Sequence, residues 1–178
     1  LNNILNINYD KSNIIYYIYN IHNYDLSILS KYHSIIENNL DDEHNIRDIS
    51  LKICKIYNCD YYFNIDSECL ITEKDILNDL ISYDKNIICP LLKKNESWSN
   101  FWGDIDNNGW YKQSFNYYNI VNNKHKGCWN VAYINNIYLI KSSIIDELDN
   151  FYSLNYEINR GCDMSFCENC RNNDIFMY

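Results

Sequence analysis

Hydrophobic residues along this chain gather in short runs of strand length, separated by stretches with helical spacing. Residues 13–19 and 60–65 are aromatic and β-branched runs that predict strands, and residues 86–89 form a third run that ends at a proline. Residues 44–57 place most of their apolar side chains on one face, and a further helix is expected over 73–82. Strand, helix, strand, helix, strand is the order of a doubly wound α/β fold.

The rest of the pattern predicts shorter elements. These are a helical turn or two over 25–32, strands over 34–36, 137–140 and 174–178, and helices over 144–149 and 162–172. Ser142 or Ser143 is expected to cap the helix over 144–149, because a hydroxyl at that point can accept from the first free backbone N–H groups. No repeat or low-complexity linker divides the chain, so we predict a single domain over residues 1–178.

Composition limits the classes of partner. The chain has 178 residues, enough for a sizeable core, and its net charge of −9 leaves no basic field for phosphates. We therefore expect no nucleic-acid partner, and no apolar run is long enough for a transmembrane segment. Because the sequence starts at Leu1 without a methionine, we expect it to be a piece of a longer protein.

Two acids follow the strand predicted over 60–65. Asp66 and Glu68 lie one residue apart where that strand ends, and the next helix is expected to begin just beyond them, from residue 72. The carboxyl ends of strands in open α/β sheets are where ligands bind. Acids at this spacing can share a hard divalent cation, which can also hold a diphosphate. The alternative is a strand that ends in a solvated acidic turn.

The second half of the chain mixes aromatic and polar residues. Its tryptophans stand beside serine, asparagine and aspartate, a mixture that suits a sugar or nucleotide pocket, although large aromatic residues also serve core packing. The candidate lining residues are Trp98, Asn100, Trp102, Trp129 and Asn130. Asp163 begins the helix predicted over 162–172 and is either an acid that complements the helix dipole or a third acid in the same cleft.

Several kinds of chemistry are not supported by the sequence. None of the histidines stands in a His-x-Asp or His-x-Glu pair, so a non-haem iron site is not expected, and no glycine-rich phosphate loop is present. Cys167 and Cys170 form a Cys-x-x-Cys with Cys162 nearby, yet a fourth zinc ligand is not evident and structural cysteines are favoured. Cys54 and Cys59 suit either a short-range disulfide or two buried thiols.

Five blocks together resemble one known family. They are DYYFNIDSECLIT (60–72), IICPLL (87–92), WSNFWG (98–103), GCWNVAY (127–133) and DMSFC (163–167). Their order and spacing over roughly residues 45–178 resemble the glycosyltransferase-type central domain of procollagen-lysine hydroxylases. The collagen galactosyltransferases share similar blocks and are the nearest competing family. With the bias toward Asn, Ile, Lys and Tyr, the chain also looks like the hydroxylase-glycosyltransferases of giant DNA viruses.

The resemblance implies a GT-A-like, Rossmann-type α/β sheet flanked by helices. It also implies truncation at both ends, with the first strand before Leu1 and an iron-binding part after Tyr178. By this resemblance Asp66 and Glu68 hold Mn²⁺ and the diphosphate of a UDP-sugar. Glu68 departs from the usual Asp-x-Asp pattern, and its arm is longer by one methylene. Asp163 would be a catalytic base or an acceptor contact, and the five residues listed above would line the pocket.

Two functional hypotheses follow from the resemblance. The first is UDP-sugar transfer to hydroxylysine or to its galactosyl derivative, and the second is a non-catalytic accessory domain of a procollagen-lysine dioxygenase. The implied partners are collagen or a collagen-like polypeptide and the neighbouring domains of the same protein. The implied location is the lumen of the endoplasmic reticulum for a cellular protein, or the host cell or virion for a viral one.

Overall fold

A three-stranded sheet forms the centre of the molecule. In the computed structural model, which describes residues 2–38, 42–95 and 98–178, the sheet has the order β3 (Tyr61–Ile65), β9 (Ile137–Lys141), β4 (Ile87–Ile88). Strand β9 is antiparallel to both neighbours and pairs Leu139 with Phe63 on one side and with Ile88 on the other. The sheet is extended next to β4 by a bridge between Ile87 and Met177.

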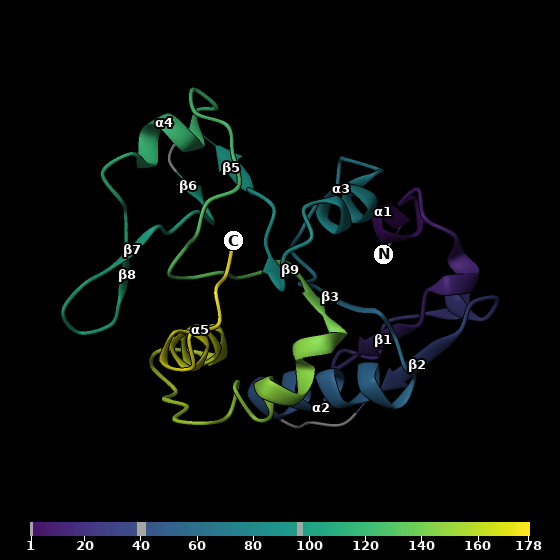
Figure 1. Ribbon diagram of the computed structural model, residues 1–178. Coiled ribbons are helices and arrows are strands. Elements are labelled where there is room, and N and C mark those ends of the chain that lie inside the picture. Colours follow the sequence, from purple (N-terminus) through teal and green to yellow (C-terminus); the bar gives the residue numbers. More distant parts are fainter. Residues whose placement is uncertain (1, 39–41, 96–97) are drawn as a thin grey trace.

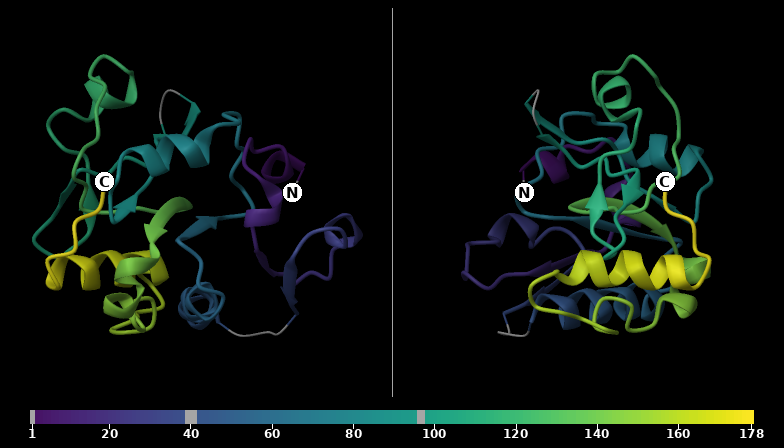
Figure 2. Two further views of the ribbon diagram at one scale, coloured as in Figure 1. Left: turned by 45° about the vertical axis from the view of Figure 1, so that its right-hand side comes forward. Right: turned by 90° about the vertical axis from the view of Figure 1, so that its left-hand side faces the viewer.

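Helices cover both faces of this sheet. Figure 1 and both views of Figure 2 show α3 (Ile76–Ser82) on one side and α2 (Glu43–Ile56) with α5 (Cys162–Asn172) on the other. The alternation of side chains along β9 accounts for this arrangement. Leu139 packs with the α3 side, whereas Tyr138 belongs to the larger core cluster, which includes residues of α2 and α5.

Two further groups of elements flank the central layers. Near the N-terminus, β1 (Tyr16–Tyr19) and β2 (Ser34–Glu37) form a parallel pair. The short helical elements of this part are α1 (Asn2–Leu5), η1 (Lys11–Asn13) and η2 (Ser27–Leu29). A lobe seen at the upper left of Figure 1 contains β5 (Lys93–Asn95), β6 (Trp98–Ser99), β7 (Asp104–Ile105), β8 (Tyr111–Lys112) and α4 (Tyr117–Val121).

The predicted α/β class is confirmed, and the sheet differs from a fully parallel one. The chain returns from the lobe as β9 and inserts antiparallel between β3 and β4, so these two consecutive strands are not neighbours. Because β3 lies at the edge of this sheet, its residues are half-buried. Within the described residues, no helix combines the length and the apolar content needed to cross a bilayer.

Two helix starts also differ from the prediction. The serine cap was wrong, because η3 (Ser142–Leu148) is a 3₁₀ helix that already contains both serines and whose N-cap position is Lys141. The Ser142 N–H instead donates to the carbonyl oxygen of Asp60 at 2.9 Å, which continues the pairing with the β3 side. Helix α3 starts at Ile76 and not at residue 73. Just before the helix, the carbonyl oxygen of Lys74 accepts a hydrogen bond from the Asn8 N–H at 2.7 Å.

Candidate functional site

Arg47 is the buried centre of a polar cluster beneath the sheet. It lies on the face of α2 that also carries Leu51 and Cys54, so the amphipathic helix directs its guanidinium into the interior, where 8% of the side chain stays exposed. Its Nη1 donates to the hydroxyl of Tyr138 at 3.0 Å. Burial works to lower the pKa of Arg47, but the surrounding Tyr138, Asp163 and Asp66 oxygens raise it. The guanidinium is therefore a permanent positive charge.

Asp66, the first acid of the predicted motif, contacts this guanidinium directly. Its Oδ1 accepts from Arg47 Nη2 at 2.8 Å and from Asn64 Nδ2 at 3.3 Å, and its Oδ2 accepts from Asn136 Nδ2 at 3.2 Å. Asn136 has a φ of 62°, a left-handed conformation that asparagine tolerates, and its carbonyl oxygen accepts from the Asp66 N–H at 2.8 Å. Both carboxylate oxygens of Asp66 thus have donors, although 26% of the side chain remains exposed.

Asp163, on α5, approaches the same guanidinium. It lies in the first turn of α5, after Gly161, whose φ of 80° is readily adopted only by glycine. Its Oδ1 is 3.5 Å from Arg47 Nη1, which is an ion pair, and this buried oxygen has no hydrogen-bond partner among the described residues. Burial, opposed by Arg47 and assisted by Asp66, raises the pKa of Asp163 to about 7.

A third acid completes the cluster, and it is not the one predicted. Glu43, one turn before Arg47 on α2, accepts from Arg47 Nε at 2.9 Å and from Nη2 at 2.6 Å. The side chain of Glu68 is exposed, and no contact of it with the cluster is found in the described part of the chain. The structure therefore unites Asp66 and Asp163 through Arg47 and leaves Glu68 outside.

The contacts of Asp66 also test whether this site suits Mn²⁺. A divalent cation needs several oxygen ligands, and a neighbouring positive charge opposes its binding. Both oxygens of Asp66 accept hydrogen bonds, and one of them faces the buried Arg47. Across residues 2–38, 42–95 and 98–178, no three His, Cys, Asp or Glu side chains are placed to hold a metal ion. With Arg47 in place, the residues do not fit the ion.

The predicted pocket residues separate into buried and exposed members. Asn100 is buried: its Oδ1 accepts from the Leu92 N–H at 2.6 Å, and its Nδ2 donates to the Pro90 carbonyl oxygen at 3.0 Å. Trp102 packs on the main core, with its ring 4.6 Å from that of Tyr111. Both residues therefore hold the lobe against the sheet. Trp98 lies in β6, but its side chain falls outside the part that the structure describes.

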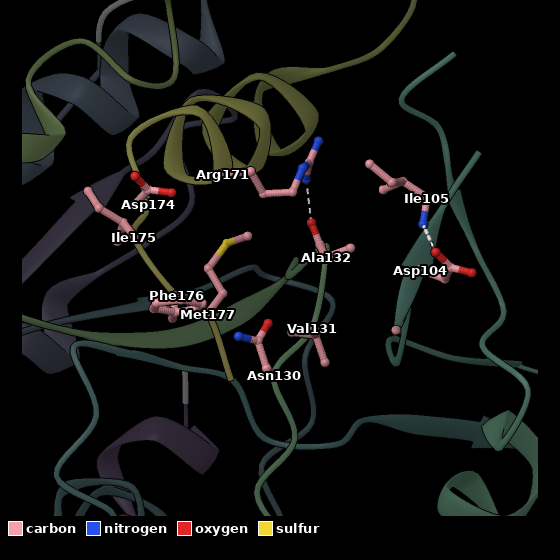
Figure 3. Close-up of a pocket in the computed structure, with 11 residues that line it drawn as sticks. Asp104, Ile105, Asn130, Val131, Ala132, Arg171, Asp174, Ile175, Phe176 and Met177 are labelled. Atoms are coloured by element: carbon pink, nitrogen blue, oxygen red, sulfur yellow. Dashed lines mark hydrogen bonds between the residues drawn. The ribbon is translucent and has the colours of Figure 1, made fainter. Parts of the chain in front are cut away.

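The other two members lie near an open cavity of about 250 Å³. Trp129 is half-buried against the main core, and the exposed Asn130 lines the cavity with the segment that follows α5. Figure 3 shows Arg171 reaching from α5 toward the carbonyl oxygen of Ala132, to which its Nη1 donates, while Asp104 lies on the opposite side. No residue of the acid cluster lines this cavity, so the predicted site residues occupy separate regions.

The cysteines contribute no metal centre within the described residues. All eight are free thiols, and Cys162, Cys167 and Cys170 are buried along α5. Burial raises the pKa of Cys162 to about 12, as expected for an unreactive structural thiol. The preference for structural cysteines in the Cys-x-x-Cys therefore agrees with their packing, and Cys54 and Cys59 are two thiols in this structure.

Two residues of this site, Glu43 and Arg47, were not predicted from the sequence, and Arg47 is the central one. Its signal is nevertheless present, because Arg47, Leu51 and Cys54 recur at helical spacing on one face of α2. A charge on the apolar stripe of an amphipathic helix has to find partners inside the protein, since burying it alone is costly. Apart from Glu43 one turn earlier, the partners are Asp66 after β3, Tyr138 in β9 and Asp163 in α5, which no local pattern connects.

A family model described as glycosyltransferase family 25, N-terminal domain, matches residues 22–178. The chain belongs to this family. The crystal structure of A197 from STIV has a TM-score of 0.52 over 86% of this chain and 75% of that one, with 14% sequence identity, and this likeness concerns the fold alone.

Curated relatives agree with the predicted resemblance. The "Procollagen lysyl hydroxylase and glycosyltransferase" of Acanthamoeba polyphaga mimivirus is 46% identical over 123 residues, which are 67% of this chain and 14% of the viral protein. "Procollagen-lysine,2-oxoglutarate 5-dioxygenase 1" of Gallus gallus is 38% identical over 138 residues, which are 74% of this chain and 18% of that protein. The resemblance to this group is confirmed, and the chain spans less than a fifth of the length of these relatives.

Proposed function

We propose that this chain serves a collagen-lysine-modifying protein as an accessory module of glycosyltransferase type, without transferring sugar itself. The main support is the environment of Asp66, whose two carboxylate oxygens accept hydrogen bonds from Arg47, Asn64 and Asn136. In a metal-dependent transferase this acid would hold the cation that binds the diphosphate. Here it is a member of a polar cluster that ties α2, β3 and α5 together.

The partners of such a module are collagen or a collagen-like polypeptide and the adjoining domains of the same protein. The proposal for collagen is supported by the similar proteins, which are named for procollagen and its lysine. The chain covers only a small part of those proteins, and in this proposal other parts of the parent carry the activity. The module would then position or connect those parts.

The test is a substitution in the full-length protein that contains this chain. Asp66→Asn keeps the shape of the side chain and removes the charge that a metal-dependent transferase needs. We expect unchanged transfer from UDP-galactose or UDP-glucose to a hydroxylysine-containing collagen peptide, with circular dichroism as the control for folding. If transfer is lost while the protein stays folded, the accessory role is wrong.

The second candidate is UDP-sugar transfer by this domain itself, to hydroxylysine or its galactosyl derivative, including the activity of a collagen β-galactosyltransferase. One observation favours it: a carboxyl such as Asp163, with a pKa of about 7, is suited to proton transfer near neutral pH. In this candidate Asp66 and Glu68 would hold Mn²⁺ and the donor diphosphate, and the ion would neutralise the leaving group. The pocket would be lined by Trp98, Asn100, Trp102, Trp129 and Asn130.

Asp163→Asn distinguishes the two candidates in the same transfer assay. Loss of a general base typically lowers a rate by about 10²–10⁴-fold, which is the result that the second candidate requires. The accessory role requires no change in transfer. Asp146→Asn, an exposed acid paired with Lys55 away from the cluster, serves as the matched control.

A further inference from the structure

The three acids around Arg47 share one geometric feature: each contacts a nitrogen of the same guanidinium. Glu43 Oε1 is 2.6 Å and Asp66 Oδ1 is 2.8 Å from the single atom Nη2, and Asp163 Oδ1 is 3.5 Å from Nη1. They come from α2, from the residue that follows β3 and from the first turn of α5. The fold therefore brings three carboxylates together around one positive charge.

Arg47 Nη2 lies close to the position that a divalent cation bound by both Glu43 and Asp66 would occupy. Calcium binds protein oxygens at about 2.3–2.6 Å and magnesium at about 2.0–2.1 Å. The oxygens of Glu43 and Asp66 would therefore have to move inward by only a few tenths of an ångström to nearly an ångström to coordinate an ion that replaced this nitrogen. The guanidinium keeps the carboxylates apart at hydrogen-bond distance and keeps them neutralised.

We infer that Arg47 is the built-in cation of this acidic site, so that the unsubstituted chain binds no divalent cation at Asp66. Removal of Arg47 would then uncover a divalent-cation site made of Glu43, Asp66 and Asp163. The inference rests on the proposed function for the meaning of the site, but its test does not involve sugar transfer. It also changes which acids matter, because Glu43 and Asp163 take the place predicted for Glu68.

The position of the charge supports this inference. Arginine stays protonated at every physiological pH, so the counter-ion cannot be lost by titration. The guanidinium also donates to Tyr138, whose hydroxyl is hydrogen-bonded to that of Tyr152, which anchors the charge in the core. A metal ion at Asp66 would have to displace a side chain that is almost fully buried and held by four oxygen-bearing residues.

The experiment measures Mn²⁺ bound by the full-length protein that contains this chain, from the loss of the electron paramagnetic resonance signal of free Mn²⁺. The wild type and Asp66→Asn are expected to bind equal amounts, since sites elsewhere in the protein are common to both. Arg47→Met is expected to bind an additional Mn²⁺, which the double variant Arg47→Met with Asp66→Asn loses. Arg160→Met is the control, because Arg160 is a comparably buried arginine that pairs with Glu168 at 3.0 Å.

Two results would overturn the inference. One is saturable Mn²⁺ binding to the wild type that Asp66→Asn abolishes, which is decisive even if Arg47→Met does not fold. The other is a folded Arg47→Met that binds no more Mn²⁺ than the wild type. If Arg47→Met refolds only when Mn²⁺ is present, the inference is supported. Loss of sugar transfer in Asp66→Asn, with no Mn²⁺ at Asp66 in the wild type, would overturn the accessory role and leave this inference intact.

Discussion

The acid cluster and the open cavity each contain an arginine, acids and asparagine, yet they satisfy their polar groups in different ways. In the cluster, Arg47 faces three carboxylates and lies inside the protein. At the cavity, Arg171 donates to a backbone carbonyl oxygen, while Asn130 is exposed to solvent. Acids at the end of a strand are therefore not always open to a ligand, because a single interior cation can pair with them.

The largest expected effect separates the two arginines. Arg47→Ala leaves Asp66 and Asp163 without their counter-ion, and removing one partner of a buried ion pair typically costs about 3–5 kcal/mol. Arg171→Ala removes one hydrogen bond of a charged donor, for which we expect a loss of about 1–2 kcal/mol. Urea unfolding of both variants measures the difference, and equal losses would contradict the contrast between the regions.

The next effect compares two asparagines that were predicted to line one pocket. Asn100→Ala removes the side-chain partner of the Leu92 N–H and of the Pro90 carbonyl oxygen at a part-buried position, which should lower the free energy of unfolding by about 1–3 kcal/mol. Asn130→Ala changes an exposed residue and should stay within about 0.5 kcal/mol of the wild type. Thermal unfolding of the pair provides the measurement, and an equally large loss for Asn130→Ala would show that it is not simply solvated.

The pH dependence of stability tests the environment of Asp163. Its pKa is raised to about 7 in the folded state, chiefly by burial, so the folded protein retains a proton that the unfolded chain has released. This contribution to stability is complete below about pH 4 and is lost as the pH rises to about 7. Asp163→Asn lacks the titration, so its stability relative to wild type should rise by on the order of 1–3 kcal/mol between pH 4 and 8. The free energy of unfolding of both proteins is measured as a function of pH, and parallel curves would contradict the raised pKa of Asp163.

The smallest expected effect concerns Glu68. Because its side chain is exposed and lies outside the cluster, Glu68→Gln should change the free energy of unfolding by less than about 0.5 kcal/mol. Glu43→Gln, which weakens a contact with Arg47 at 2.6 Å, should cost more, although Glu43 itself is largely exposed. Chemical denaturation of the two variants under one buffer condition measures the difference. A larger loss of stability for Glu68→Gln than for Glu43→Gln would indicate that Glu68 belongs to the site.

The elements with strong local patterns were predictable from the sequence. The amphipathic stretch at 44–57 became α2 within one residue at each end, and the aromatic run at 60–65 became β3. The place of β9 was not predictable, because a strand pattern at 137–140 contains no information on which strands it will join. The cap at Ser142 failed for a related reason, since a backbone pairing with Asp60 decided the conformation there.

Two of the three acids of the site were predictable from the sequence, but the third acid and the arrangement were not. The position of Asp66 after a strand and of Asp163 in a first helical turn followed from local spacing. Their common partner did not, because Arg47 reaches them from a helix that precedes both in the chain. The roles of Trp98, Trp129 and Glu68 in ligand binding stay predictions.

The insertion of β9 between β3 and β4 has a consequence for how the chain folds. Tyr61 pairs with Lys141, so the sheet closes only after the whole intervening lobe has been synthesised and the loop between the strands has been closed. Pairings that are so distant in sequence form slowly, because the entropy of loop closure is lost before the contacts are gained. Until then the edges of β3 and β4 that β9 will cover are open to other chains, and this interval is when the protein is most exposed to aggregation.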